Sequence, residues 1–324
     1  MPRIGLNPYG LAYAVGLQGA GTPRANPSPI GLDGFVRVAR DIDARCLEIH
    51  GGWLDAMPAD ALARLRDGCV EHRMTPVVSV GLTQTAGETL EAAIAHARAV
   101  GAALIRLGLT PVLEGSRAKW GGRWLEMVAH ARATLAREAR RAAAAGLDLA
   151  IEDHQDFGSE ELVAMAEEAG PNVGVVFDTG NPFAVGEDPV AFARRAAHRI
   201  RHVHLKDYRA QFTAEGYRLV RCAIGDGAVP FDELWQVLGD DDLTASIEPG
   251  ALEARHIRLF TPDWWRGYPP REASELGTAI GRLRRRQLAD DEPFETPWER
   301  GAAAEEIVDY ELAQIRRSAA NMMK

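Results

Sequence analysis

Four short apolar runs in the second half of the chain each end in a side chain that can bind a metal ion. These side chains are Glu152, Asp178, His204 and Glu248, which end the runs 149–152, 173–178, 200–204 and 245–248. Carboxylate oxygens and an imidazole nitrogen form a mixed ligand set that suits a divalent cation. Short apolar runs separated by helical patterns are typical of buried parallel strands. The carboxyl ends of such strands meet at one mouth of a closed barrel, so we predict that the four side chains converge.

Two further histidines each lie two residues from one of these predicted ligands. Glu152 and His154 are two residues apart, and so are His202 and His204, which places each pair on one side of its strand. We predict that His154 is an additional acid or base, because imidazole titrates near working pH; the alternative is that it orients Glu152 by a hydrogen bond. His202 is a candidate substrate contact, with a place in the core or behind the ligands as the alternative.

A metal ion at this mouth would assist the removal of a proton next to a carbonyl. Negative charge accumulates on the carbonyl oxygen as the proton leaves, and a bound dication stabilises that charge. A carboxylate or imidazole close to the carbon-bound proton then serves as the base.

The remaining pattern predicts a (β/α)8 TIM barrel with a C-terminal helical extension. Four more strands are expected at 4–8, 46–50, 76–80 and 103–107, and helices at 32–43, 58–72, 86–100, 124–145, 159–168, 189–198, 231–238 and 272–285. Strict alternation with short connections indicates parallel crossover units, and eight of them favour a closed barrel. We assign residues 1–288 to the barrel and 289–324 to the extension. Its helix, 302–322, has an apolar stripe that packs against the barrel or, alternatively, against another subunit.

Composition limits the class of protein. The 324 residues are 46% hydrophobic and carry a net charge of −9, so the chain lacks the basic footprint of a nucleic-acid-binding protein. Its three cysteines are far apart and are expected to be buried thiols. No leader and no apolar run long enough for a membrane span are evident, so we expect a cytoplasmic protein without a membrane partner.

Several side chains outside the ligand set are candidates for binding substrate. Arg24 lies in a long Gly- and Pro-rich loop, 9–30, that we interpret as a wall of the site. Arg106, late in a strand, can bind a carboxylate, phosphate or hydroxyl group, and Lys206 can bind a substrate oxygen. Trp264 belongs to the aromatic segment 255–270, which we interpret as a lid or substrate wall, with a subunit interface as the alternative.

Five short motifs resemble the sugar isomerase/epimerase branch of the xylose-isomerase-like barrels. They are Glu152-Asp153-His154, Phe177-Asp178-Thr179-Gly180-Asn181, the run 202–207 (His-Val-His-Leu-Lys-Asp), Ile247-Glu248-Pro249-Gly250 and the Gly-rich run 224–231. The resemblance spans residues 4–285 and does not include the extension.

This resemblance implies one divalent ion, most often Mn²⁺ with Mg²⁺, Co²⁺ or Zn²⁺ as alternatives, held by Glu152, Asp178, His204 and Glu248. The two glutamates flank the carbonyl-bearing carbon in that branch and also move protons. The residue three after the aspartate is often a histidine there, whereas this chain has Asn181, which we retain as a substrate contact. Related DNA-repair endonucleases need many histidines for a zinc cluster, so Asn181 and the missing basic face argue against a nuclease.

The resulting hypothesis is an enzyme that acts on a keto (3-oxo) sugar or glycoside. Relatives in this group include C-glycoside deglycosidase catalytic subunits and decarboxylases of 3-oxo-sugar acids, so isomerisation or epimerisation competes with a lyase outcome. A non-catalytic sugar-binding barrel and, last, an AP-endonuclease-like nuclease are the alternatives. We expect a homo-oligomer or a hetero-oligomer with a small partner subunit.

Overall fold

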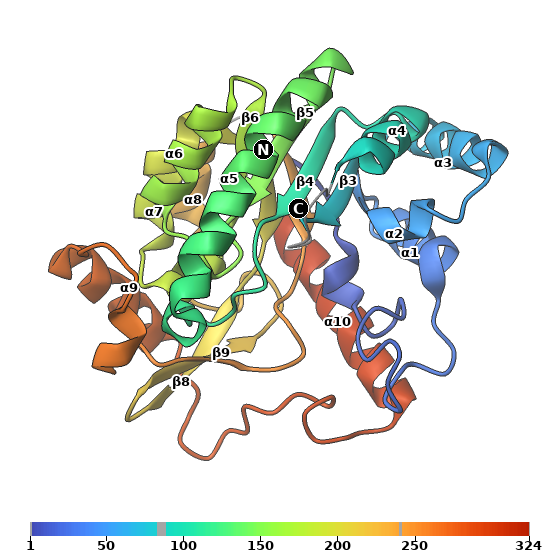
Figure 1. Cartoon of the computed structure of the whole chain (residues 1–324). Coiled ribbons are helices and arrows are strands. Elements are labelled where there is room, and N and C mark those ends of the chain that lie inside the picture. The colour runs from blue at the N-terminus through green and yellow to red at the C-terminus, as the bar shows by residue number, and fades with distance from the viewer. Residues whose placement is uncertain (1, 83–88, 240–241, 324) are drawn as a thin grey trace.

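The computed structural model describes residues 2–82, 89–239 and 242–323. Eight parallel strands close into a barrel in the order β1-β10-β7-β6-β5-β4-β3-β2 (Figure 1). They are β1 (Arg3–Leu6), β2 (Cys46–His50), β3 (Thr75–Gly81), β4 (Leu104–Gly108), β5 (Asp148–Glu152), β6 (Val173–Asp178), β7 (Ile200–Leu205) and β10 (Thr244–Ile247). The predicted barrel is confirmed. The first strand is shorter than predicted because Pro8 begins a 3-10 turn, η1 (Pro8–Leu11).

Helices between the strands cover the outside of the barrel (Figure 1). They are α1 (Gly31–Asp41), α2 (Gly51–Leu54), α3 (Ala59–Glu71), α4 (Glu91–Val100), α5 (Gly122–Ala144), α6 (Ser159–Ala169), α7 (Pro189–Ala196), α8 (Phe231–Leu238) and α9 (Ala273–Arg285). All eight predicted helices are present. The predicted start of the helix 86–100 lies partly outside the described residues.

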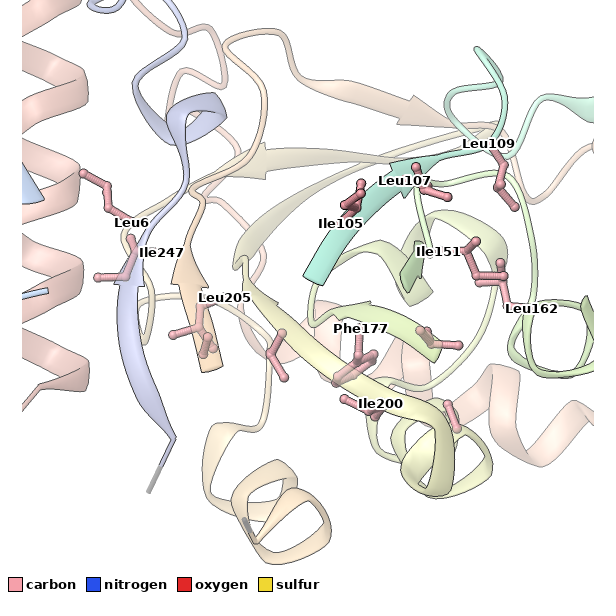
Figure 2. Packing of buried hydrophobic residues seen from close by; sticks show 14 of the residues in the cluster. Leu6, Ile105, Leu107, Leu109, Ile151, Leu162, Phe177, Ile200, Leu205 and Ile247 are labelled. Carbon is pink, nitrogen blue, oxygen red and sulfur yellow. The ribbon is translucent and has the colours of Figure 1, made fainter. Parts of the chain in front are cut away.

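Alternation along the strands decides which side chains reach the barrel interior. In β5, Leu149 and Ile151 belong to the same buried cluster as Leu162 of α6, and Figure 2 shows Ile151 beside Leu162. Successive strand residues point to opposite faces, so Ala150 and Glu152 face inward. The inward-facing residues of the neighbouring strands lie level with one another, because the register pairs Asp178 of β6 with His204 of β7. The packing of apolar residues between the strands and the helices therefore determines which polar side chains face the barrel interior.

A small antiparallel sheet follows β7 and was not predicted. It is formed by β8 (Tyr208–Thr213), β9 (Gly216–Arg221) and β11 (Arg255–Ile257), in the order β11-β9-β8. The aromatic segment 255–270 is therefore not a plain loop, since it begins with β11 and contains the turn η5 (Pro262–Trp265).

The C-terminal helix α10 (Ala304–Met322) packs against η1 of the same chain. The buried carboxylate of Glu311 accepts hydrogen bonds from the backbone N–H groups of Tyr13 (3.2 Å) and Ala14 (2.8 Å). Ile315 is fully buried beside Gly10. Of the two predicted fates of this helix, the structure shows packing against the barrel.

The three cysteines, Cys46, Cys69 and Cys222, are buried and unpaired, as predicted. A search of the described helices for one both long and apolar enough to span a bilayer finds none.

Candidate active site

The ends of four adjacent strands bring together the four side chains that the sequence singled out. One ligand atom each from Glu152, Asp178, His204 and Glu248 lies within 4.8 Å of the others. All four side chains are buried. Two carboxylates from β5 and β6, a third just after β10 and an imidazole from β7 thus occupy one small volume. Their role as ligands stays a prediction.

Positive side chains already neutralise this carboxylate cluster. The Lys206 ammonium contacts Asp178 Oδ2 and lies 2.9 Å from Glu248 Oε1, and the Arg106 guanidinium contacts Glu152 Oε2. Buried carboxylates are costly unless a cation compensates them. The geometry and the chemistry of the donor atoms therefore fit a divalent cation.

His204 connects the cluster to a carboxylate behind it. Its Nδ1 lies 3.0 Å from both Glu152 Oε1 and Glu248 Oε2, whereas its Nε2 lies 2.9 Å from Glu48 Oε2. Burial alone would lower the pKa of His204, but Glu48 and Glu248 outweigh it and raise the pKa to about 10. Nδ1 is thus the nitrogen that faces the ligand set, and Glu48 fixes the ring through Nε2.

Glu48 was missed from the sequence, although it lies in the predicted second strand. Burial would raise the pKa of this fully buried carboxyl, but the imidazoles of His204 and His202 hold it well below its ordinary value. The signal available in the sequence was alternation, since Glu48 stands between the apolar residues Leu47 and Ile49 of the strand and so faces the opposite side from them.

His202 lies in the barrel interior behind the ligand set, where it is surrounded by other side chains. Its Nδ1 pairs with Thr244 Oγ1 at 2.7 Å and its Nε2 with Ser246 Oγ at 3.0 Å, while Glu48 Oε2 is 3.4 Å from Nε2. The side chain is fully buried, and burial lowers its pKa. This placement agrees with the alternative of a core position and not with a direct substrate contact.

Backbone amides orient the carboxylate of Asp178. Its Oδ1 accepts hydrogen bonds from the N–H groups of Gly180 (3.0 Å) and Asn181 (3.2 Å), whereas Oδ2 contacts the Lys206 ammonium. Asp153 Oδ1 in turn accepts the backbone N–H of Asp178 at 2.5 Å. The Asn181 side chain accepts a hydrogen bond from Gln155 and does not line the cavity described next.

A cavity of about 500 Å³ opens directly onto the ligand set. Glu248, Lys206, Arg106 and His154 line it, together with residues of the first loop such as Tyr9. Its volume lies in the range of small-molecule sites, about 300–1,000 Å³. A larger hollow of about 1090 Å³ lies between β9, α9 and α10 and contains none of the ligand residues.

His154 reaches the cavity, as expected, but its protonation differs from the expectation. Burial, followed by the charges of Arg106 and Lys206, lowers the pKa of His154 to about 3. The imidazole is therefore neutral at working pH, where it can donate or accept a hydrogen bond but cannot store a proton. Tyr208 also lines the cavity, and its hydroxyl has no hydrogen-bond partner among the described residues.

Arg24 and Trp264 lie away from the cavity. The Arg24 guanidinium stacks on Trp298 at 3.6 Å from the ring centroid and donates to its carbonyl oxygen. Trp264 is 4% exposed, and its Nε1 donates to the carbonyl oxygen of Glu114 at 2.9 Å. Trp264 and Tyr268, whose hydroxyl donates to the carbonyl oxygen of Gly115, thus pack on the chain around Glu114. Arg255, at the start of the segment 255–270, does line the cavity and was not predicted.

Comparison with known proteins gives one family and partial relatives. Residues 36–258 match the family described as "Xylose isomerase-like TIM barrel". The chain is 29% identical to inosose dehydratase of Clostridium botulinum (strain Alaska E43 / Type E3) over 116 residues, which cover 31% of this chain and 39% of that enzyme. The match thus spans about two fifths of the length of this curated relative.

Two solved structures share the fold over most of their length. The probable 3-DHS dehydratase AsbF of Bacillus anthracis is 16% identical, with a TM-score of 0.59 over 76% of this chain and 92% of that chain. The IolI protein with a bound zinc atom is 14% identical, with a TM-score of 0.52 over 87% of this chain and 95% of that chain.

Proposed function

Because the chain belongs to the xylose isomerase-like TIM barrel family, we propose that it is a divalent-metal-dependent enzyme that removes the proton next to the carbonyl of a keto sugar or cyclic keto polyol. One observation carries this proposal. Four buried ligand atoms converge within 4.8 Å at the edge of a cavity of about 500 Å³.

Glu152, Asp178, His204 and Glu248 would hold the metal ion. When bound, a divalent cation supplies a Lewis acid that stabilises the negative charge developing on the substrate carbonyl oxygen. We propose Mn²⁺ as the physiological ion, with Mg²⁺, Co²⁺ and Zn²⁺ as alternatives that the same donors accept. The zinc atom bound in the similar IolI structure supports a divalent ion.

Glu248 is the base in this proposal. It is the carboxylate of the ligand set that lines the cavity. Although burial raises the pKa of Glu248, Lys206 and His204 lower it well below its ordinary value, so the carboxylate is ionised at neutral pH. The Lys206 ammonium lies 2.9 Å from Glu248 Oε1 and orients this carboxylate. The Glu248 carboxylate then accepts the carbon-bound proton. Arg106 holds Glu152 in the same way.

The step after proton removal decides the product. We propose loss of a neighbouring hydroxyl group as water, supported by the partial match to inosose dehydratase. Tyr208 is the proposed acid for the leaving hydroxyl, because burial raises its pKa to about 12 and its hydroxyl has no partner among the described residues. Return of the proton to carbon would instead give an isomer or epimer. Departure of a carbon group would give C-glycoside cleavage or decarboxylation.

The test follows deuterium exchange by NMR with Mn²⁺-loaded protein and a panel of inosose, ketohexoses and 3-oxo-glucosides. We expect exchange next to the carbonyl of one member, with appearance of the dehydrated product. Glu248→Gln should lower the exchange rate by about 10²–10⁴-fold, whereas the exposed Glu215→Gln serves as the matched control. Tyr208→Phe should keep exchange and slow dehydration.

Absence of exchange with every member of the panel, in protein that holds its metal, would refute the proposal. Binding of a panel member without exchange would then favour the non-catalytic sugar-binding barrel.

A further inference from the structure

Arg255 lines the cavity, and the described residues leave its positive charge largely uncompensated. It lies at the start of β11, opposite Leu219 of β9, and lines the cavity beside the ligand set. Its side chain is 22% exposed. The nearest carboxylate oxygen, Glu253 Oε2, is 3.9 Å away, which is too far for a hydrogen bond.

The carboxylate of Glu253 is already engaged elsewhere. Its Oε1 accepts hydrogen bonds from Gln18 Nε2 at 2.8 Å and from Trp298 Nε1 at 2.9 Å. Arg255 Nε is buried and has no acceptor within the described parts of the chain. A guanidinium has five N–H donors, and burying them without acceptors is costly. Arg255 thus has donor capacity that the described residues do not use.

The two other cations of the cavity differ from Arg255 in that both contact carboxylates. Arg106 contacts Glu152, and Lys206 contacts Asp178 and Glu248, so both charges are taken up by the ligand set. Among the described residues that line the cavity, Arg255 is the cation that has no carboxylate within hydrogen-bond distance.

The Arg255 charge also reaches the middle of the cavity. Arg255 lines this cavity together with His154 and Tyr208. Burial is the main cause of the raised pKa of Tyr208, and the charges of Lys206 and Arg255 oppose it. The guanidinium thus belongs to the same cavity as these two uncharged groups.

We propose that Arg255 binds a carboxylate of the substrate, so that the substrate is a keto sugar acid or cyclic keto acid rather than a neutral ketose. The planar guanidinium pairs with a carboxylate through two parallel hydrogen bonds. One guanidinium neutralises one carboxylate, whereas a phosphate ester carries nearly two charges and the other cavity cations are already occupied. The inference rests on the proposed function, because it concerns the substrate of the same site.

The test measures binding by calorimetry with the full, Mn²⁺-loaded chain. One series varies a single position of one scaffold: D-fructose, D-fructuronate and D-fructose 6-phosphate. A cyclic pair, inosose and 3-dehydroshikimate, repeats the comparison between a neutral ligand and a carboxylate. We expect the carboxylate to bind about tenfold to a hundredfold more tightly than its neutral counterpart, as for a hydrogen bond to a charged group.

Variants separate recognition of the carboxylate from a structural effect. Arg255→Gln should abolish the preference for the carboxylate while leaving the affinity for the neutral ligand unchanged, and Arg255→Lys should retain part of the preference. Arg258→Gln is the matched control, because Arg258 belongs to the same segment, pairs with Glu215 at 3.1 Å and does not line the cavity.

Equal affinity for neutral and carboxylate ligands, tighter binding of the phosphate ester, or no binding of any probe would overturn the inference. Deuterium exchange keeps the two proposals apart. Exchange of neutral ketoses without a carboxylate preference refutes only the role of Arg255. A carboxylate preference without exchange refutes only the catalytic proposal.

Discussion

Metal binding should release a proton from His204, because carboxylates face both of its nitrogens in the metal-free protein. Nδ1 lies 3.0 Å from Glu152 and Glu248, and Nε2 lies 2.9 Å from Glu48. Each nitrogen therefore donates a proton to a carboxylate. An imidazole that binds a metal ion must give up the proton on the binding nitrogen. The proton on Nδ1 would pass to solvent when an ion binds there, and the proton on Nε2 would remain in the hydrogen bond to Glu48.

The size of this effect follows from the pKa of His204, which its carboxylate neighbours raise to about 10 against the opposing effect of burial. Because pH 7 lies about three units below that pKa, removing the proton from His204 at pH 7 costs about 4 kcal/mol. The affinity for the metal ion should therefore rise about tenfold for each pH unit between pH 7 and 9, with about one proton released for each ion bound.

Isothermal titration calorimetry with Mn²⁺ in two buffers of different ionisation enthalpy measures this proton release directly. Glu48→Gln is the perturbation. Because it removes a charge that holds the proton, it should lower the pKa of His204, reduce the release at pH 7.5 and flatten the pH dependence. Asp178→Asn is the control, since it removes a ligand and lowers affinity but leaves the proton on His204.

A metal affinity that is independent of pH between 7 and 9, with no protons released, would refute this account of His204. So would unchanged proton release in Glu48→Gln.

Two further substitutions test the packing around the site. The pKa of Glu311 is raised to about 7 by burial, despite Arg221 and the N–H groups of Tyr13 and Ala14. Because this folded-state pKa exceeds the unfolded value, the stability that Glu311 contributes is present below pH 4.5 and is lost as pH rises through 7. Glu311→Gln should therefore flatten the pH dependence of the urea-unfolding free energy by up to about 3 kcal/mol, and an unchanged slope would contradict this. In Gly250→Ala, the new Cβ would lie 2.4 Å from the Tyr208 ring. It should cost about 1–3 kcal/mol of stability and slow turnover while Mn²⁺ affinity holds; unaltered turnover would show that the ring position does not matter.

The barrel and its ligand set could be predicted because two local patterns agree. Each ligand residue ends an apolar run, and each run is buried on both faces, as in β6 with Asp178. The carboxyl ends of parallel strands meet at one mouth of a closed barrel. Residues that end strands, such as Glu152 and Glu248, are therefore predicted to lie close together although they are distant in the sequence.

Contacts across the barrel interior could not be predicted in the same way. Glu48 and His204 are 156 positions apart, and only the closure of the barrel places their side chains in contact. The β8–β9 hairpin did carry a signal, since Tyr208, Ala210 and Phe212 alternate with polar residues in the sequence. That signal was overlooked because a barrel pattern requires a helix after each strand.

Long side chains were the least predictable. Trp264 was predicted to contact substrate but is buried, and nothing in the local sequence indicates that its partner is the chain around Glu114. Arg24 likewise reached Trp298 of the extension instead of the cavity. Arg255 contributes to the cavity because β11 pairs with β9, a pairing that depends on the unpredicted sheet.

Lys206 gives the ligand set a cation of its own. Its ammonium group contacts Asp178 and lies 2.9 Å from Glu248, so the charges of these two buried acids are compensated within the chain. The barrel can therefore assemble with both acids side by side, because a side chain of the same polypeptide offsets their mutual repulsion.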